Sequence, residues 1–309
     1  MSYRFFTPPP ARSATGEAAE VYRQLRDEFL GPVPTFQVLS AVPELMSATW
    51  SLMREALLAG DGSRVDRELT ATAVSQANRC RFCVHAHVML LHALGEHDLA
   101  EAAARDEPPA AKADLVTWAQ ASRNPVTARW HHDGHAAELV GTVVAFHFIN
   151  RMVSSLLAPD LLPAGLQRSS MVRNVGGRLY AKVAREHKPP RKPIEEAYAE
   201  LFRTASNVDG LLSEKARAHI RAVVAAEDGI HPAHPADWAV DQVRDLPALD
   251  RVGARIALLA AFAPSAVSQG DVALWRLSHP ADADLVRLVA YGAITATDHV
   301  ATAANAALI

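Results

Sequence analysis

The sequence has only two cysteines among its 309 residues, and its 31 lysines and arginines nearly balance its 34 aspartates and glutamates. Two cysteines can form only one disulfide, which would stabilise a secreted fold poorly. In a reducing cytosol they are normally thiols. The net charge is −3, and no basic stripe with interleaved aromatic residues is present, so nucleic acid is not an expected partner.

Long hydrophobic runs are also scarce. The longest uncharged apolar stretch, Leu139–Ile149, is too short to span a bilayer and contains His147. The N-terminal residues MSYRFFTPPPARS lack the apolar core of a signal peptide. We therefore expect a soluble, cytoplasmic protein with no membrane partner.

Alternating β-branched residues are rare, whereas alanine, leucine, arginine and glutamate dominate, which predicts an all-α fold. Prolines and glycines mark the breaks between helices. Helices are expected near residues 15–30, 36–41, 43–59, 64–78, 81–94, 97–105, 110–121, 135–157, 168–186, 194–206, 213–227, 236–244, 249–262, 267–277 and 282–305.

The charged, proline-rich stretch His187–Pro193 is the best candidate for a linker. It divides the chain into a domain of residues 1–187 and a helical C-terminal domain of residues 188–309. Pro8, Pro9 and Pro10 predict an extended arm that lies on the body or on a neighbouring subunit.

The two parts show a faint internal repeat, in which residues 67–99 overlay residues 255–285 with a small gap. Glu68 falls on Ile256, Cys80 on Ser268, Cys83 on Asp271 and His87 on Trp275. The C-terminal part is thus either a degenerate second copy without an active site or a helical domain similar by chance.

The two cysteines form a C-x-x-C motif, Cys80-Arg81-Phe82-Cys83, and His87 follows four residues later. Two cysteines placed at random would have this spacing about once in 150 chains. In a cytosolic protein the motif indicates a redox couple or half of a metal site, and the alternative is a pair of small buried side chains.

If a helix begins near Cys80 or Arg81, then Cys80, Cys83 and His87 lie on one face of it, and Gly95 caps its C-terminus. The free N–H groups and the dipole at the helix N-terminus stabilise a thiolate, which is the nucleophilic form of cysteine. A pKa of Cys83 well below 8.5 would support a nucleophile, and a raised one would support simple packing. A helical hairpin could bring the carboxylate of Glu68 back toward His87.

These residues carry a resemblance to a known family. The pattern Glu68-x11-Cys80-x2-Cys83-x3-His87 resembles the signature of the alkylhydroperoxidase D-like group within the carboxymuconolactone decarboxylase superfamily. The surrounding ELTATAVSQANRCRFCVHAHVMLLHALG and the segment Phe146–Arg151 are also similar to it, and the clear resemblance covers roughly residues 4–185.

The resemblance implies an alkylhydroperoxidase D-like helical bundle and a thiol-dependent peroxidase. Cys83 would attack the peroxide, Cys80 would resolve the sulfenic acid into a disulfide, His87 would transfer protons, and Glu68 would act through His87. A thiol partner, in some members a lipoyl-bearing protein, would then reduce the disulfide. A homo-oligomer is also implied.

One position departs from the family pattern. Some members carry a second histidine between the two cysteines, where this chain has Phe82. The sequence leaves open whether His85 takes its place in proton relay. His85 and His147 are candidate pocket residues, although a structural hydrogen bond is the stronger interpretation of His147.

No metal and no cofactor are expected. His85 and His87 lie two apart on one helix and would point about 200° apart, which disfavours a shared metal. The tract His131–His135 is interpreted as the lead into a helix, and Gly176-Gly177 lacks the spacing of a nucleotide fingerprint.

Three functions are open at this point. A peroxidase or disulfide oxidoreductase in antioxidant defence fits the cysteine pair best. A lyase of the carboxymuconolactone decarboxylase type needs acid and base groups rather than a C-x-x-C motif. A non-enzymatic redox-sensing protein could use the same disulfide as a switch.

Overall fold

The computed structural model describes residues 3–124, 136–160, 166, 169–226 and 228–308. Over these residues the chain is helical, with two isolated β-bridges and no strand, which confirms the all-α prediction. The helices of the first half are α1 (Gly16–Glu28), α2 (Pro34–Leu39), α3 (Pro43–Met53), α4 (Arg64–Ala77), α5 (Arg81–Leu94), α6 (His97–Ala104), α7 (Ala110–Ala121) and α8 (Ala136–Leu156).

The second half contributes α9 (Ser170–Arg185), α10 (Ile194–Ala205), α11 (Glu214–Ala226), α12 (Pro235–Gln242), α13 (Ala248–Phe262), α14 (Gln269–Arg276) and α15 (Asp282–Leu308). These bounds follow the predicted ranges closely. The predicted helix 43–59 differs, because α3 ends at Met53 and Arg54–Leu58 form a π-helical turn that buries Arg54 beside Glu55. The tract His131–His135 lies outside the described residues.

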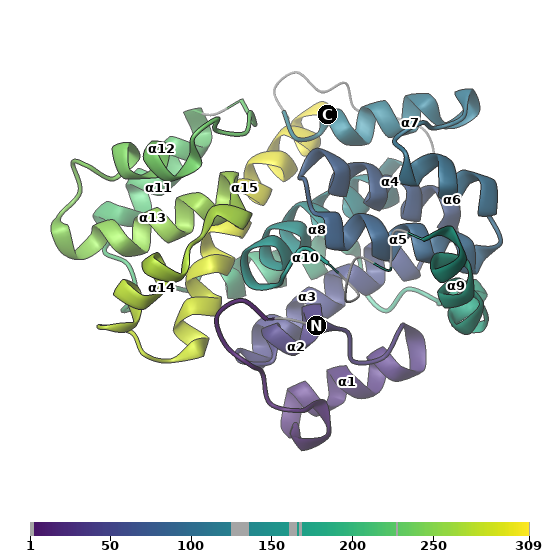
Figure 1. Ribbon diagram of the computed structural model, residues 1–309, viewed down its shortest axis with the longest axis horizontal. Helices are drawn as coiled ribbons and strands as arrows, with labels where there is room; N and C mark the ends of the chain where they lie inside the picture. The colour runs from purple at the N-terminus through teal and green to yellow at the C-terminus, as the bar shows by residue number, and fades with distance from the viewer. Residues whose placement is uncertain (1–2, 125–135, 161–165, 167–168, 227, 309) are drawn as a thin grey trace.

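Helix α8 lies at the centre of the molecule and joins its two sides. It packs against α4 on one side and against α15 on the other, and α13 packs on α15 in turn. Figure 1 shows α11 to α15 on the left and the α4–α5 hairpin on the right, with α8 between them. Residues 137–156 of α8 are long and apolar enough to cross a membrane, but 94% of that window is buried inside the protein, as in a core helix.

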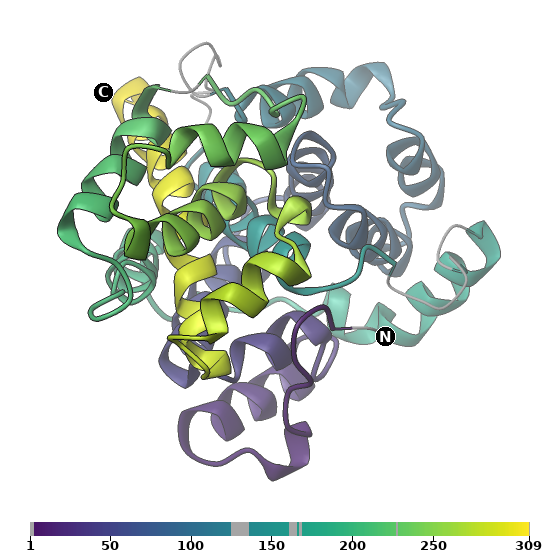
Figure 2. The ribbon, with the colours of Figure 1, turned by 60° about the vertical axis from the view of Figure 1, so that its left-hand side comes forward.

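Helix α9 runs along α5 at the edge of the molecule, as the teal helix on the right of Figure 2 shows. The close approach depends on Gly177, because a Cβ atom there would lie 2.9 Å from the backbone nitrogen of Ala93. The glycine pair of this helix therefore has a packing role, and it lets α9 form one wall beside α5.

The N-terminal arm lies on the body. Tyr3 forms an antiparallel bridge with Leu157, and the backbone N–H of Arg4 donates to the carbonyl of Leu156 over 3.0 Å. The guanidinium of Arg4 also donates to backbone carbonyls on both sides of the molecule, including those of Ser154 and Ser265. The arm thereby ties the end of α8 to the turn after α13.

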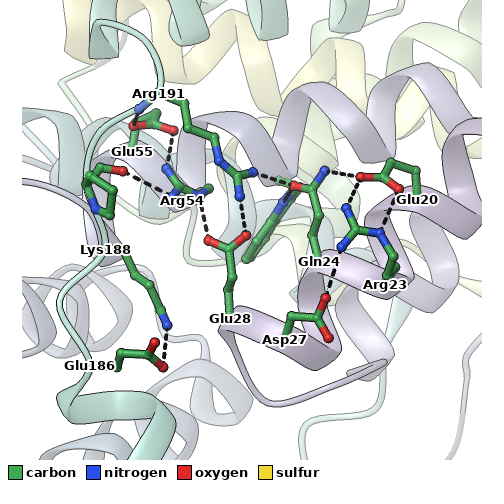
Figure 3. Close-up of polar contacts among 12 residues, drawn as sticks. Glu20, Arg23, Gln24, Asp27, Glu28, Arg54, Glu55, Glu186, Lys188 and Arg191 are labelled. Carbon is green, nitrogen blue, oxygen red and sulfur yellow. Dashed lines mark hydrogen bonds and ion pairs between the residues drawn. The ribbon is translucent and has the colours of Figure 1, made fainter.

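The predicted linker is held against the first half of the chain by buried polar contacts (Figure 3). Lys188 pairs with Ala59 in a parallel bridge, and the side chain of Arg54 donates to the carbonyl of Pro189 over 3.1 Å. The backbone N–H of Arg191 donates to Glu55 over 3.0 Å. A division of the chain into domains at residue 187 stays a prediction, and the segment at that point is well anchored.

In the proposed repeat, the N-terminus of α14 corresponds to that of α5, although α14 has 8 residues and α5 has 14. Ser268 is the N-cap residue of α14, as Cys80 is of α5, and Asp271 occupies the place of Cys83. Ser268 and Asp271 form a capping box, and Asp271 also pairs with Arg255 at 3.0 Å. Where the first hairpin carries a dithiol, the second carries a helix cap.

Candidate active site

The cysteine pair lies at the tight turn between α4 and α5. Asn78 ends α4, and Arg79 takes a left-handed φ of 56°, which reverses the chain within two residues. Cys80 then serves as the N-cap residue of α5, and its backbone N–H donates to the carbonyl of Ser75 over 2.8 Å. The predicted helix start and the cap at Gly95, with its φ of 98°, are both confirmed.

The two sulfur atoms are neighbours, since Cys80 Sγ and Cys83 Sγ are 2.7 Å apart. Both residues are free cysteines, and both are buried. One residue is the helix cap and the other lies in the first turn, so the sulfurs need to move by less than 1 Å to reach the S–S bond length of about 2.05 Å. The arrangement can therefore cycle between a dithiol and a disulfide without a change of fold.

The two thiols ionise differently. Burial raises the pKa of Cys83 well above its ordinary value, and the adjacent Cys80 raises it further. Burial also opposes ionisation of Cys80, but hydrogen bonds from Cys83 and Ser154 outweigh it, so the pKa of Cys80 lies below its ordinary value. The direction at Cys83 is the one expected of a packed thiol, and the first negative charge of the pair resides on Cys80.

Glu68 and His87 form the second part of the site. The hairpin brings them together as the sequence predicted, with His87 Nδ1 at 2.6 Å from Glu68 Oε2. Arg64 holds the other carboxylate oxygen, with Nη2 at 2.6 Å from Glu68 Oε1. Burial favours the neutral acid, but Arg64 and His87 more than offset it, so the pKa of Glu68 lies below its ordinary value. A fully buried carboxylate thus stays charged and orients the imidazole.

An apolar cavity of about 290 Å³ opens onto Cys83 and His87. The ring of His87 stands edge-on to that of Phe146, with the ring centroids 4.4 Å apart. The wall is formed mainly by aliphatic and aromatic side chains of α2, α5, α8 and α9, among them Phe36, Leu90, Phe146, Ile149 and Leu179. The cavity suits an apolar molecule that presents one reactive group to Cys83.

The two candidate pocket histidines have different positions. His85 lines the cavity together with His87, although the two are only two residues apart on α5. His147 lines neither of the cavities that reach the cysteines, so its placement at the pocket is corrected. It is buried in a polar network with Asn78, Ser122 and Arg151, because α8 turns this face toward α4 and α7.

Three further residues, which the sequence did not indicate, touch the site. Asn150 and Ser154 of α8 lie beside Cys83 and Cys80 respectively, and each hydrogen bond favours the thiolate of its cysteine. Arg64 lies one turn before Glu68. Helical spacing is the signal that could have indicated them. Asn150 and Ser154 are polar residues four apart in the mainly apolar helix α8, and Arg64 is four residues before Glu68.

Comparisons with known proteins agree with this geometry. Residues 43–121 match the carboxymuconolactone decarboxylase family, and this range contains Glu68, Cys80, Cys83 and His87. An alkyl hydroperoxide reductase of Mycobacterium tuberculosis is 35% identical to the chain over 327 residues, an alignment that covers 97% of this chain and 94% of the relative. The chain belongs to the carboxymuconolactone decarboxylase family.

The likeness to the mycobacterial relative extends beyond the range that matches the family, because the alignment covers nearly the whole chain. No solved structure matches the chain. Within the described residues, no three His, Cys, Asp or Glu side chains are grouped so that they could hold a metal ion. In this member of the carboxymuconolactone decarboxylase family, the thiol pair and the Glu68–His87 pair are the candidate reactive groups.

Proposed function

We propose that this protein is a thiol-dependent peroxidase that reduces organic hydroperoxides through the Cys80–Cys83 couple, in antioxidant defence. The observation that carries the proposal is the thiol of Cys83 in the wall of an apolar cavity, with the thiol of Cys80 and the Glu68–His87 pair beside it. The name of the mycobacterial relative supports the same chemistry.

Cys83 is the attacking residue in this proposal, because it lines the cavity together with His87 and Cys80 does not. Its proton passes to His87, which Glu68 holds in place, and its sulfur then attacks the terminal oxygen of the hydroperoxide. The O–O bond breaks, an alcohol leaves after taking a proton from the site, and Cys83 becomes a sulfenic acid. The Cys80 thiol then displaces water from that sulfenic acid and forms the disulfide.

The cavity also supports a preference for bulky substrates. Phe36, Ile149 and Leu179 surround the space that the organic part of a hydroperoxide would fill. Burying an apolar group stabilises the complex by roughly 25 cal/mol per Å². Hydrogen peroxide has no such group, so an aryl or alkyl hydroperoxide is the better substrate.

The partners follow from the same proposal. A thiol donor, either a small thiol or a lipoyl-bearing protein, returns the disulfide to the dithiol. Met171 and Leu179 on α9 are 76% and 77% exposed, and apolar side chains in such positions support a homo-oligomer. A cytoplasmic location is part of the same proposal, because both cysteines are free thiols and a reducing compartment keeps them so.

The test is a thiol titration before and after one equivalent of cumene hydroperoxide, with mass spectrometry of the peptide that carries both cysteines. We expect the loss of two thiols and a decrease of about two daltons within seconds, because one disulfide forms. Hydrogen peroxide should react more slowly. If both thiols survive, or oxidise no faster than free cysteine, hydroperoxide is not the substrate.

Replacing Glu68 with glutamine should slow this oxidation by about tenfold to a hundredfold, since a neutral amide holds the imidazole of His87 in its position for proton transfer less firmly than a carboxylate does. The fold should remain intact, because glutamine matches glutamate in size and its one side-chain oxygen can still accept the hydrogen bond from Arg64. Glu138→Gln is the matched control, as Glu138 pairs with Arg67 at 2.9 Å outside the site. An oxidation rate equal to that of the Glu138 variant would remove Glu68 from the mechanism.

The lyase alternative is less favoured, because its acid and base chemistry would leave the adjacent thiols without a role. A redox sensor would use the same disulfide without turnover. Catalytic turnover with a thiol donor separates the peroxidase from the sensor.

A further inference from the structure

A second cavity, of about 260 Å³, reaches the cysteine pair from another side. It is lined by Cys80 and Ser154, whereas the apolar cavity is lined by Cys83 and His87. Among the described residues only Phe82 lines both cavities, so its ring stands between them. A small molecule can thus reach each sulfur through a different cavity.

The second cavity differs in charge from the first. Three arginines line it: Arg4, Arg79 and Arg81. Asp160 pairs with Arg81 at 3.3 Å and offsets one of these charges. Arg79 is exposed, and within the described part of the chain its side chain makes no ion pair or hydrogen bond. The cavity at Cys80 therefore has an excess of positive charge and an arginine available to bind an anion.

The direction of disulfide exchange gives this cavity a use. A thiolate that attacks a disulfide approaches in line with the S–S bond, on the side away from the leaving sulfur. When Cys80 is attacked and Cys83 leaves, the thiolate has to approach Cys80 from the side opposite Cys83. The second cavity, called the arginine cavity below, fits this approach, because Cys80 lines it and Cys83 does not. Burial and Cys80 raise the pKa of Cys83, so the sulfur that leaves takes up a proton as the S–S bond breaks, and the hydrogen bond of Asn150 offsets only part of this effect.

We propose that the reductant of the Cys80–Cys83 disulfide binds in the arginine cavity, and that this reductant is a small thiol bearing an anionic group. The proposal rests on the proposed peroxidase function. Its thiolate attacks Cys80 Sγ, the Cys80–Cys83 bond breaks, and the electron pair goes to Cys83, which then takes up a proton. A second thiolate attacks the mixed disulfide at the reductant sulfur. Cys80 is released, and the reductant leaves as its own disulfide.

The test uses the reduction half-reaction alone. The Cys80–Cys83 disulfide is prepared with diamide, so that no peroxide activity is required. Its reduction is then followed with dihydrolipoate and with dihydrolipoamide, which carry the same dithiol and differ in one carboxylate. We expect dihydrolipoate to react about fivefold faster at low salt, and the difference to disappear near 1 M salt, where screening is complete within a few ångströms.

Arg79→Asn should remove most of the preference, because asparagine also tolerates the left-handed backbone at this position but has no charge. Arg79→Lys should retain it, and Asp160→Asn should increase it by about twofold. Arg105→Asn is the control, since Arg105 pairs with Glu107 on the surface, away from both cavities.

Equal rates for the two dithiols in the unmodified protein, or a preference that Arg79→Asn leaves unchanged, would overturn the proposal. The salt dependence of the unmodified protein remains a test even if a variant does not fold. If the proposed function fails, the signature is different: peroxide does not form the disulfide, whereas diamide does.

Discussion

Replacing Cys83 with serine is expected to abolish peroxide consumption. Cys83 is the cysteine that lines the apolar cavity with His87, and a serine hydroxyl cannot form a sulfenic acid or a disulfide. The rate of cumene hydroperoxide loss should fall to that of the buffer. Far-ultraviolet circular dichroism should be unchanged, because serine is close to cysteine in size.

The matching substitution, Cys80→Ser, should give a different result. Cys83 would still be oxidised once, but no second thiol could displace water from the sulfenic acid. One equivalent of peroxide should be consumed, after which a dimedone adduct on Cys83 should be detectable by mass spectrometry.

The two variants also show which of the two cysteines attacks the peroxide. The pKa of Cys80 is lowered and that of Cys83 is raised, so electrostatics alone would favour attack by Cys80. If Cys83→Ser consumes one equivalent and carries the adduct on Cys80, the roles are reversed. Sustained turnover in the Cys83 variant would exclude the disulfide mechanism altogether.

Replacing Arg54 with alanine is expected to cause the largest loss of stability. Its side chain is 3% exposed and pairs with Glu28 at 2.7 Å and with Glu55 at 2.7 Å (Figure 3). Removing one partner of a buried ion pair costs about 3–5 kcal/mol, because the remaining charges have lost their compensation. The melting temperature should fall by several degrees, by about 2–4 °C for each kcal/mol.

Arg23→Ala is the matched control in the same part of the molecule. Arg23 also pairs with two carboxylates, Glu20 and Asp27, but its side chain is 55% exposed. Solvent screens such pairs, so no measurable change in melting temperature is expected. Equal shifts in the two variants would show that the Arg54 cluster does not anchor residues 186–191 to the body.

The helices were accessible from the sequence because their signals are local. Apolar spacing, prolines and glycines set nearly all of the boundaries, including the start of α5 at Arg81 and its cap at Gly95. The break at Met53 was not predicted. The π-helical turn that follows depends on buried ion pairs between Arg54, Glu55 and segments distant in the chain, which no local pattern records.

The site was predicted in part. Glu68, Cys80, Cys83 and His87 share one helical hairpin, so their spacing was sufficient to bring them together. Asn150 and Ser154 come from α8, and their contact with the sulfurs depends on how α8 packs across the hairpin. His147, on the same helix, lies in the polar network instead of the pocket.

The sequence by itself therefore determined the all-α fold, the adjacent cysteines and the carboxylate–histidine pair, since these rest on periodicity and on residues close in the chain. The tertiary structure decided which thiol carries the first negative charge and which cavity each sulfur faces. Burial and the hydrogen bonds from α8 set the ionisation of the two thiols. The cavity at Cys80 forms where the N-terminal arm meets the turn after α13, and all of these contacts arise only when segments distant in the chain pack together.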